Sequence, residues 1–363
     1  MKRPSIMLHR YIGIVVGIFL AIIGLTGSVL VFHSEIDSVL YPQVHHTVSQ
    51  DVPISLQQVA NTVKQQYPKE KLRFIAIPQQ ASEPYRVVTG SKNEPQNNIY
   101  INPYNGEILG VHPENSTLMS IIFKIHTSFF AGDIGVFLVG ACGVLLLVRA
   151  ISGLIIWPGW KKLEAGFKIR WNAPWQLLHY DFHKVIGLFS VGFLILAAVT
   201  GTLMTFNQEV RSLGYWVIGT TQPEKPISSP QQNLSQLTLD QYLQKAESSL
   251  PGGATTFIFP ASDKKAAVRV RKRLPGEIHP NGRSFIYLDQ YNGEVLKIEN
   301  IYHAAWVEHL LAWTYPLHIG SYSGLGVRIL YLIFGLTPAI LMVTGFVIFW
   351  MKNYGATGRR KRA

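Results

Sequence analysis

Four histidines stand at matched places beside long apolar segments of this 363-residue chain. His9 and His183 open the similar sequences His-Arg-Tyr-Ile-Gly and His-Lys-Val-Ile-Gly, and His126 and His318 each stand six residues before a glycine. Two imidazoles that face each other across a helix bundle supply the two axial ligands of a six-coordinate haem iron. These positions therefore predict one haem between His9 and His183 and a second haem between His126 and His318.

Other histidines leave the pairing open. His33 ends the first apolar segment and is a further candidate as an outer ligand or a propionate partner. His179 precedes His183 by four residues, so the two share a face if this segment is helical. A histidine at a membrane edge is also often only an amphipathic anchor, and a duplication copies such residues too. Four residues before the last apolar segment are candidates for a substrate or outer-haem pocket: His303, Trp306, His309 and Trp313.

Four segments of more than twenty residues contain almost no charged side chain: 11–32, 134–157, 185–206 and 325–350. Each is long enough to cross ~30 Å of hydrocarbon at about 1.5 Å per residue. We therefore expect transmembrane helices over residues 8–33, 126–158, 183–207 and 318–352.

Basic residues precede the first of these helices, lie between the second and third, and follow the fourth. The positive-inside rule then places both termini, the loop 159–182 and the basic tail 353–363 in the cytoplasm. Residues 34–125 and 208–317 fall outside, in the periplasm if the chain lies in a bacterial inner membrane. The net charge of +12 comes largely from these clusters, so it indicates topology and not nucleic-acid binding.

The two halves of the chain resemble each other. The first and third apolar segments align without a gap and bring Gly27 onto Gly201, and the second and fourth bring Gly153 onto Gly345. Parallel repeats of this kind are related by a pseudo-twofold axis along the membrane normal. We therefore expect a four-helix transmembrane bundle made from two parallel repeats.

The segments between the helices also match. Each contains a strand, an Asn-Gly turn and a second strand, at 99–109 and at 285–296, which is a strong hairpin signal. Upstream, Ser55 and Thr238 each begin a short amphipathic helix that runs to a proline. A helix against a small antiparallel sheet predicts one α+β domain in each half, over 34–125 and 208–317.

Several classes of site are excluded by composition. The single cysteine, Cys142, cannot form an intramolecular disulfide or a Cys-x-x-Cys metal site. A Gly-x-Gly-x-x-Gly sequence after a strand is also absent, and the cytoplasmic parts are too short for a flavin or nicotinamide domain. Any electrons that reach the two expected haems must therefore come from a separate molecule, either a membrane quinol or a cytoplasmic reductase.

These motifs together resemble the PepSY-associated transmembrane family over about residues 5–352. The sequences that carry the resemblance are the opening Leu8–Gly13, the segment Asp181–Gly187 and the two Tyr-Asn-Gly-Glu hairpins. The hairpins are similar to the family's aspartate-x-tyrosine-x-glycine-glutamate signature. Asn102 replaces the aspartate in the first copy, and Asp289 retains it in the second.

Some members of this family are similar to ferric-siderophore reductases of the bacterial inner membrane that hold b-type haems between four helices. The resemblance implies haem ligation by His9, His126, His183 and His318, and delivery of electrons to a ferric siderophore or other ferric chelate in the periplasm. Two alternatives stay open. One is a membrane-anchored PepSY regulator of a protease, and the other is an accessory or permease protein of siderophore transport.

Overall fold

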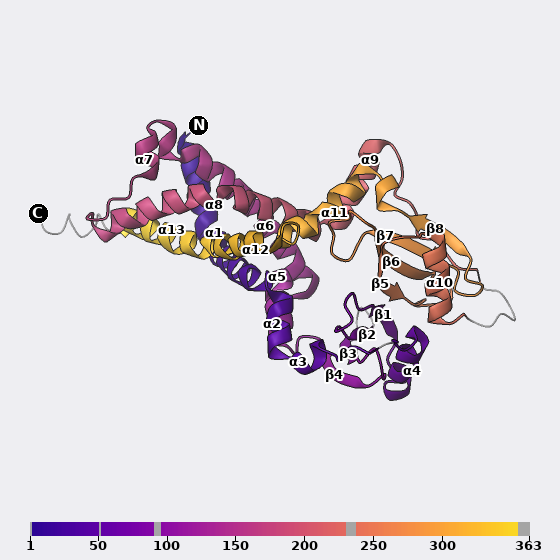
Figure 1. The fold of residues 1–363 in the computed structure, drawn as a ribbon. Helices are drawn as coiled ribbons and strands as arrows, with labels where there is room; N and C mark the ends of the chain where they lie inside the picture. Colours follow the sequence, from indigo (N-terminus) through magenta and orange to yellow (C-terminus); the bar gives the residue numbers. More distant parts are fainter. Residues whose placement is uncertain (1, 51, 91–95, 230–236, 355–363) are drawn as a thin grey trace, which may run out of the picture. The chain divides into compact units, whose positions relative to one another are not determined.

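The structure is a computed structural model that describes residues 2–50, 52–90, 96–229 and 237–354 (Figure 1). The chain forms two compact units. The helical unit comprises Met1–His33, Ile122–Asn207 and Leu317–Ala363, and the sheet unit comprises Ser34–Ile121 and Gln208–Pro316. Each unit therefore collects pieces from both halves of the sequence.

The described residues of the helical unit include four long apolar helices, of which the fourth is interrupted at Leu336. They are α1 (Lys2–Leu30), α6 (Gly132–Ile156), α8 (Trp175–Thr205) and the pair α12 (Gly324–Gly335) and α13 (Thr337–Tyr354). The corresponding spans are apolar enough and long enough to cross a membrane: Arg3–Leu30, Gly132–Trp160, Trp175–Thr205 and Gly324–Asn353. The expectation of four such helices is confirmed.

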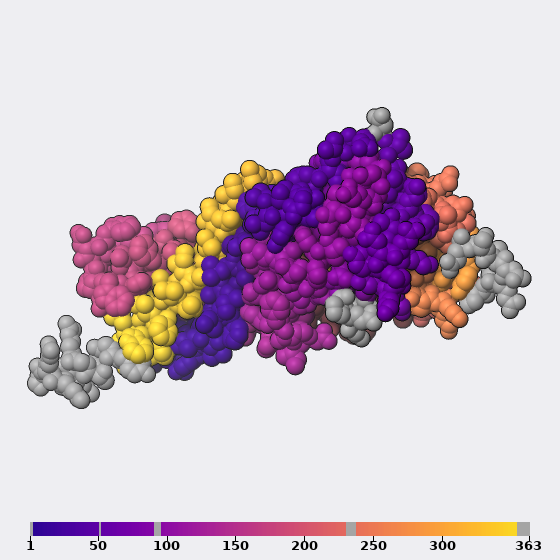
Figure 2. All heavy atoms as spheres, turned by 90° about the horizontal axis from the view of Figure 1, so that it is seen from below, coloured from indigo at the N-terminus to yellow at the C-terminus, as the bar shows by residue number. Residues whose placement is uncertain are grey.

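These helices pack as a bundle in which each has two long neighbours. Helix α1 packs against α6 and α13, and α8 packs against the same two helices. Figure 2 shows the yellow α13 running alongside the indigo α1. Many of the large apolar side chains of the bundle, such as Val15 and Phe137, are exposed on its outer surface. An outward-facing apolar surface is what a lipid environment stabilises.

Three helix boundaries in this unit differ clearly from the sequence-based expectation. His126 does not begin the second long helix but lies in a separate helix, α5 (Leu118–Ser128), and His318 likewise lies in α11 (Trp306–Ile319). Phe129 and Phe130 have positive φ angles of 48° and 60°, and Gly320 has a φ of 73°. Left-handed residues end an α-helix, so these positions separate the histidine-bearing helices from the long ones. The third long helix begins at Trp175, earlier than the expected residue 183.

In the part of the sheet unit that the structure describes, eight strands form one antiparallel sheet in the order β4-β3-β2-β1-β5-β6-β7-β8. The strands are β1 (Leu72–Ala76), β2 (Tyr85–Thr89), β3 (Asn97–Ile101), β4 (Ile108–Pro113), β5 (Ala254–Phe259), β6 (Val268–Arg273), β7 (Ser284–Leu288) and β8 (Val295–Glu299). The two expected domains thus share one sheet, because β1 pairs with β5 through Ile75 and Ile258. Pairing removes an exposed edge strand from each half.

One face of this sheet is covered by two helices, α4 (Leu56–Gln66) and α10 (Leu239–Ser249). Ser55 and Thr238 form capping boxes at their first turns, as the sequence predicts. Val59 and Ala246 are fully buried against strand residues such as Ile99 and Ile286. The expected hairpins are present as the antiparallel pairs β3–β4 and β7–β8.

Shorter helices connect these parts. They are α2 (His33–Leu40), α3 (Pro42–His45), η1 (Pro158–Trp160), α7 (Leu163–Phe167), α9 (Asn207–Ile218) and η2 (Ile301–His303).

Candidate functional site

The helical unit brings four histidines together as two pairs. The ring centroids of His9 in α1 and His183 in α8 lie 6.1 Å apart, with the ring planes at 89°. The ring centroids of His126 in α5 and His318 in α11 are also 6.1 Å apart, at 55°. These are the two pairs expected from the sequence.

The spacing of each pair matches what one metal ion between two imidazoles requires. A metal–imidazole bond of about 2 Å on each side, plus about 1 Å from each nitrogen to its ring centre, separates the centroids by about 6 Å. Among the described residues no group of three or more His, Cys, Asp or Glu side chains converges as a metal site. Two histidines alone leave most of a coordination shell to another ligand, and in a haem the porphyrin nitrogens supply it.

Backbone carbonyls fix the tautomer of one histidine in each pair. His9 Nδ1 lies 3.1 Å from the carbonyl oxygen of Arg149, and His126 Nδ1 lies 3.0 Å from that of Ile23. A carbonyl can only accept, so Nδ1 carries the proton and donates it in both rings. The lone pair of the neutral ring is then on Nε2, the nitrogen that remains for a metal.

Threonine hydroxyls fix the tautomer of the other two histidines. His183 Nδ1 lies 2.8 Å from Thr344 Oγ1, and His318 Nδ1 lies 2.9 Å from Thr200 Oγ1. Each threonine donates its own proton to the carbonyl four residues earlier in its helix, at 2.8 and 2.7 Å. The hydroxyl oxygen therefore accepts from Nδ1–H, and Nε2 again holds the lone pair.

Each histidine also lies against a glycine that follows a hydroxyl residue. The four dipeptides are Thr26-Gly27, Ser152-Gly153, Thr200-Gly201 and Thr344-Gly345. A Cβ built on these glycines would stand 2.9 to 3.2 Å from the Cε1 atom of the facing histidine. The glycines thus leave room for the rings, and the hydroxyls orient them, as supporting residues commonly do around metal-bound imidazole.

The contacts between histidines and Ser/Thr-Gly dipeptides correspond to a sequence pattern that the positions of the histidines alone do not reveal. The hydroxyl residues stand out in the sequence only as polar exceptions within apolar helices, with no role assigned. Their signal is the recurrence of a Ser/Thr-Gly dipeptide in all four long helices. Helix geometry alone does not reveal that each dipeptide faces a histidine on another helix.

A cavity of about 370 Å³ adjoins His183 in the helical unit. Its lining is largely apolar but includes the basic residues Arg10, Arg149 and Lys184. Arg149 lies against Gly13, and its Nε is buried without a hydrogen-bond partner among the described residues. An apolar space that includes an arginine whose Nε lacks such a partner fits a macrocycle that carries carboxylate side chains.

A buried carboxylate braces the start of α8 beside His183. Asp181 is fully buried and accepts from Arg170 Nε at 2.8 Å and Nη2 at 2.9 Å, and it forms an ion pair with Lys184 Nζ at 2.8 Å. Lys184 also donates to the carbonyl of Ala165. These bonds hold the segment before α8 onto the helix and so fix the position of His183.

The remaining candidate residues lie elsewhere. His33 begins α2, and His179 lies in α8 with its ring 5.4 Å from that of Trp175. Arg328 donates to the carbonyl of Val31 and stacks on Phe32. The four residues expected near a substrate belong to the sheet unit, in η2 and α11: His303, Trp306, His309 and Trp313.

Residues 6–352 match the model of a protein family described as the PepSY-associated TM region. Because the match covers nearly the whole chain, the protein belongs to this family of membrane proteins. An uncharacterized protein of Pseudomonas aeruginosa is similar, with 24% identity over 272 residues. The alignment covers 67% of this chain and 66% of the relative, slightly less than two thirds of the relative's length.

Proposed function

We propose that this protein is a haem-containing reductase of the bacterial inner membrane that passes electrons to a ferric siderophore in the periplasm. The observation that carries the proposal is the presence of two histidine pairs, each 6.1 Å between centroids and each with both Nε2 lone pairs left for a metal. His9 with His183, and His126 with His318, would each hold one haem b. Such haems supply reversible one-electron transfer.

The placement of the pairs along the helices suits transfer across a bilayer. His9 and Gly27 both belong to α1, and Gly27 faces His126 of the other pair. Their separation of 18 positions corresponds to a rise of about 27 Å in an α-helix. The pairs therefore lie near opposite ends of the bundle, one toward each membrane surface.

The direction of transfer follows from the basic clusters. By the positive-inside rule the His9 pair faces the cytoplasm, and the sheet unit and the His126 pair face the periplasm. The donor is a quinol or a cytoplasmic reductase, because the chain has no dinucleotide-binding sequence. The acceptor is a ferric chelate, since hard oxygen ligands bind ferrous iron more weakly and one electron releases the metal.

The experiment is anaerobic mixing of the dithionite-reduced, detergent-purified protein with a ferric siderophore in a stopped-flow spectrometer. The haem bands should return to their oxidised positions while a ferrous-specific dye reports one ferrous ion for each haem oxidised. Bands that stay reduced in the presence of excess ferric siderophore would remove the reductase function. A protein without haem bands would instead favour the membrane-anchored regulator.

A further inference from the structure

The face of the sheet opposite α4 and α10 carries aromatic and basic side chains in register. Successive strand residues point to opposite faces, and Val268, Val270 and Ile286 face the core beneath the helices. The other face of β5, β6 and β7 therefore shows two cross-strand rows. One row is Phe257, Arg271 and Phe285, and the other is Phe259, Arg269 and Tyr287.

The arginines of these rows stack on the rings beside them. Arg269 Cζ lies 4.1 Å from the centroid of Phe259 and 5.2 Å from that of Phe285. Arg271 Cζ lies 5.5 Å from Phe285 and 5.7 Å from Phe257. The three phenylalanines are half-buried, so part of each remains accessible. Flat guanidinium and aromatic groups in alternation offer a stacking surface with a positive charge.

Neither central arginine is neutralised. In the described part of the chain no carboxylate forms an ion pair with Arg269 or Arg271, and Arg269 Nε is buried without a hydrogen-bond partner. Burial, followed by the charges of Arg283 and Arg269, lowers the pKa of Arg271 to about 10. The positive charges of Arg269, Arg271 and Arg283 repel one another, and a bound anion would reduce this repulsion.

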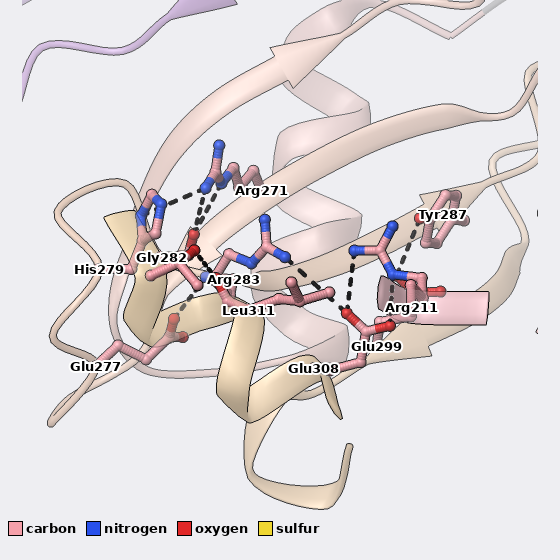
Figure 3. A network of polar contacts seen from close by, with 11 residues as sticks. Arg211, Arg271, Glu277, His279, Gly282, Arg283, Tyr287, Glu299, Glu308 and Leu311 are labelled. Carbon is pink, nitrogen blue, oxygen red and sulfur yellow. Dashed lines mark hydrogen bonds and ion pairs between the residues drawn. The ribbon is translucent and has the colours of Figure 1, made fainter. Parts of the chain in front are cut away.

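A backbone carbonyl just before β7 holds Arg271 in position but does not neutralise its charge. Arg271 donates to the carbonyl of Gly282 from Nε at 2.9 Å and from Nη2 at 2.6 Å (Figure 3). Farther along, Arg211 and Arg283 share the single carboxylate of Glu308, at 2.7 and 3.9 Å. This group therefore adds positive charge to that of the central arginines.

Two further carboxylates act on these charges. Glu277 is buried and accepts from the backbone N–H groups of Leu274 and Arg283. Its charge opposes the lowering of the Arg271 pKa. Glu299 of β8 pairs in register with Phe285, and it accepts from Tyr287 at 3.0 Å. Lys297 Nζ neutralises it at 2.7 Å. The balance of charge around the rows therefore stays positive.

The first half of the sheet shows that the fold does not demand this pattern. There β1, β2 and β3 present the equivalent rows Ala76, Arg86, Tyr100 and Phe74, Val88, Asn98. The second half also has an Arg–Tyr pair, but it carries a second arginine and two further phenylalanines. Because the same strand arrangement forms in the first half without these residues, the sheet does not require them, which favours a role in binding.

We infer that the face formed by Phe257, Phe259, Arg269, Arg271, Phe285 and Tyr287 binds an anionic metal complex whose chelator carries aromatic rings, as a ferric catecholate does. The inference rests on the proposed function for the identity of the metal complex. The rings of the chelator would stack on the phenylalanines and guanidinium planes, and its anionic oxygens would accept charge-assisted hydrogen bonds from the arginines. An uncharged ferric hydroxamate would make neither set of contacts as well.

The test is titration calorimetry of the full-length protein in detergent with the gallium(III) complex of 2,3-dihydroxybenzoate, which cannot be reduced. The variants are Arg269→Gln, which removes the charge with the unpartnered Nε, and Phe259→Leu, which removes the ring beneath it. Lys64→Gln is the control, because Lys64 is exposed on α4, which covers the opposite face. Thermal unfolding of each variant establishes that it is folded.

Saturable binding that weakens about tenfold in each face variant but not in Lys64→Gln is expected. Equal affinity in wild type and both variants, competition by inorganic phosphate at matched concentration, or equally tight binding of a neutral gallium trihydroxamate would overturn the inference. A haem spectrum of the same sample separates this claim from the proposed function. A coloured protein that does not bind the complex overturns only the binding face, and a colourless protein that binds it overturns only the haem reductase.

Discussion

The imidazole Nδ1 of His183 lies 2.8 Å from the hydroxyl oxygen of Thr344, on a different helix of the bundle. That hydroxyl donates to the carbonyl of Ile340, so it receives the imidazole proton and leaves Nε2 unprotonated. The same relationship joins His318 to Thr200. Both histidines therefore present an unprotonated Nε2, which is the form of imidazole that can bind a metal.

The first prediction concerns this hydroxyl. Thr344→Val keeps the shape of the side chain but removes the acceptor of the His183 proton, so haem affinity at this pair should fall by about 10- to 100-fold. Where haem is still bound between His9 and His183, its reduction potential should rise. An imidazole without this hydrogen bond is less basic and stabilises ferric iron less well. Haem content and a redox titration measure both effects. Thr205→Val, which removes a hydroxyl that bonds only within α8, should change neither.

The second prediction uses the glycines. A Cβ at Gly27 would stand 2.9 Å from His126 Cε1, whereas one at Gly192 would have nothing within 4 Å. Gly27→Val should therefore displace His126 and lower the haem content by one per chain, and Gly192→Val should retain both haems. Equal haem content in the two purified variants would show that the rings do not need this space.

The third prediction separates the apoprotein from the haem-loaded protein. Arg149 keeps a buried Nε without a partner in the described residues, which costs about 1–3 kcal/mol. Arg149→Leu should raise the melting temperature of the apoprotein, because the unpartnered polar atom is removed. It should weaken haem retention, because a haem carboxylate would lose the guanidinium that pairs with it. A lower melting temperature in both forms would mean that Arg149 has a structural role instead.

The fourth prediction concerns pH and the sheet unit. Burial and the charges of Arg271, Arg283 and Arg273 lower the pKa of His279 from 6.5 to about 3. Its Nδ1 accepts from the backbone N–H of Asn281 at 3.2 Å, which requires the neutral ring. The unfolded chain binds this proton near pH 6.5 and the folded chain does not. The contribution of His279 to the free energy of unfolding is therefore fully present above about pH 6.5, and it is lost as the pH falls toward 3.

The loss from this one group should reach about 2–3 kcal/mol at pH 4.5. His279→Phe keeps the stacking on Tyr315, whose ring centroid is 5.2 Å away, and removes the titration. The variant should thus lose less stability than wild type between pH 7 and 4.5, measured by thermal unfolding. Parallel loss in both proteins would contradict the assignment.

The sequence was most informative where the signal is local. Runs of apolar residues predicted the four long helices, Asn-Gly turns predicted the hairpins, and Ser55 and Thr238 predicted the starts of two helices. Matching offsets also predicted the histidine pairs, because a twofold arrangement places equivalent residues opposite each other.

The missed features depend on contacts between distant segments. Pairing of Ile75 with Ile258 merges two expected domains into one sheet, and alternation within a strand does not specify its neighbour. The break at Phe129 and Phe130 places His126 on its own helix, although neither residue type favours a left-handed conformation. The hydroxyl–histidine bonds likewise join residues about 100 or more positions apart.

The central claim is that the two histidine pairs hold haem. The most direct measurement is a reduced-minus-oxidised visible spectrum of the detergent-purified protein from haem-replete cells, with haem quantified per chain. We predict a b-type spectrum with two haems per chain, one in either His9→Ala or His126→Ala, and two in His46→Ala, whose histidine is exposed in the sheet unit. A colourless protein, or haem content unchanged by the His9 and His126 substitutions, would contradict it.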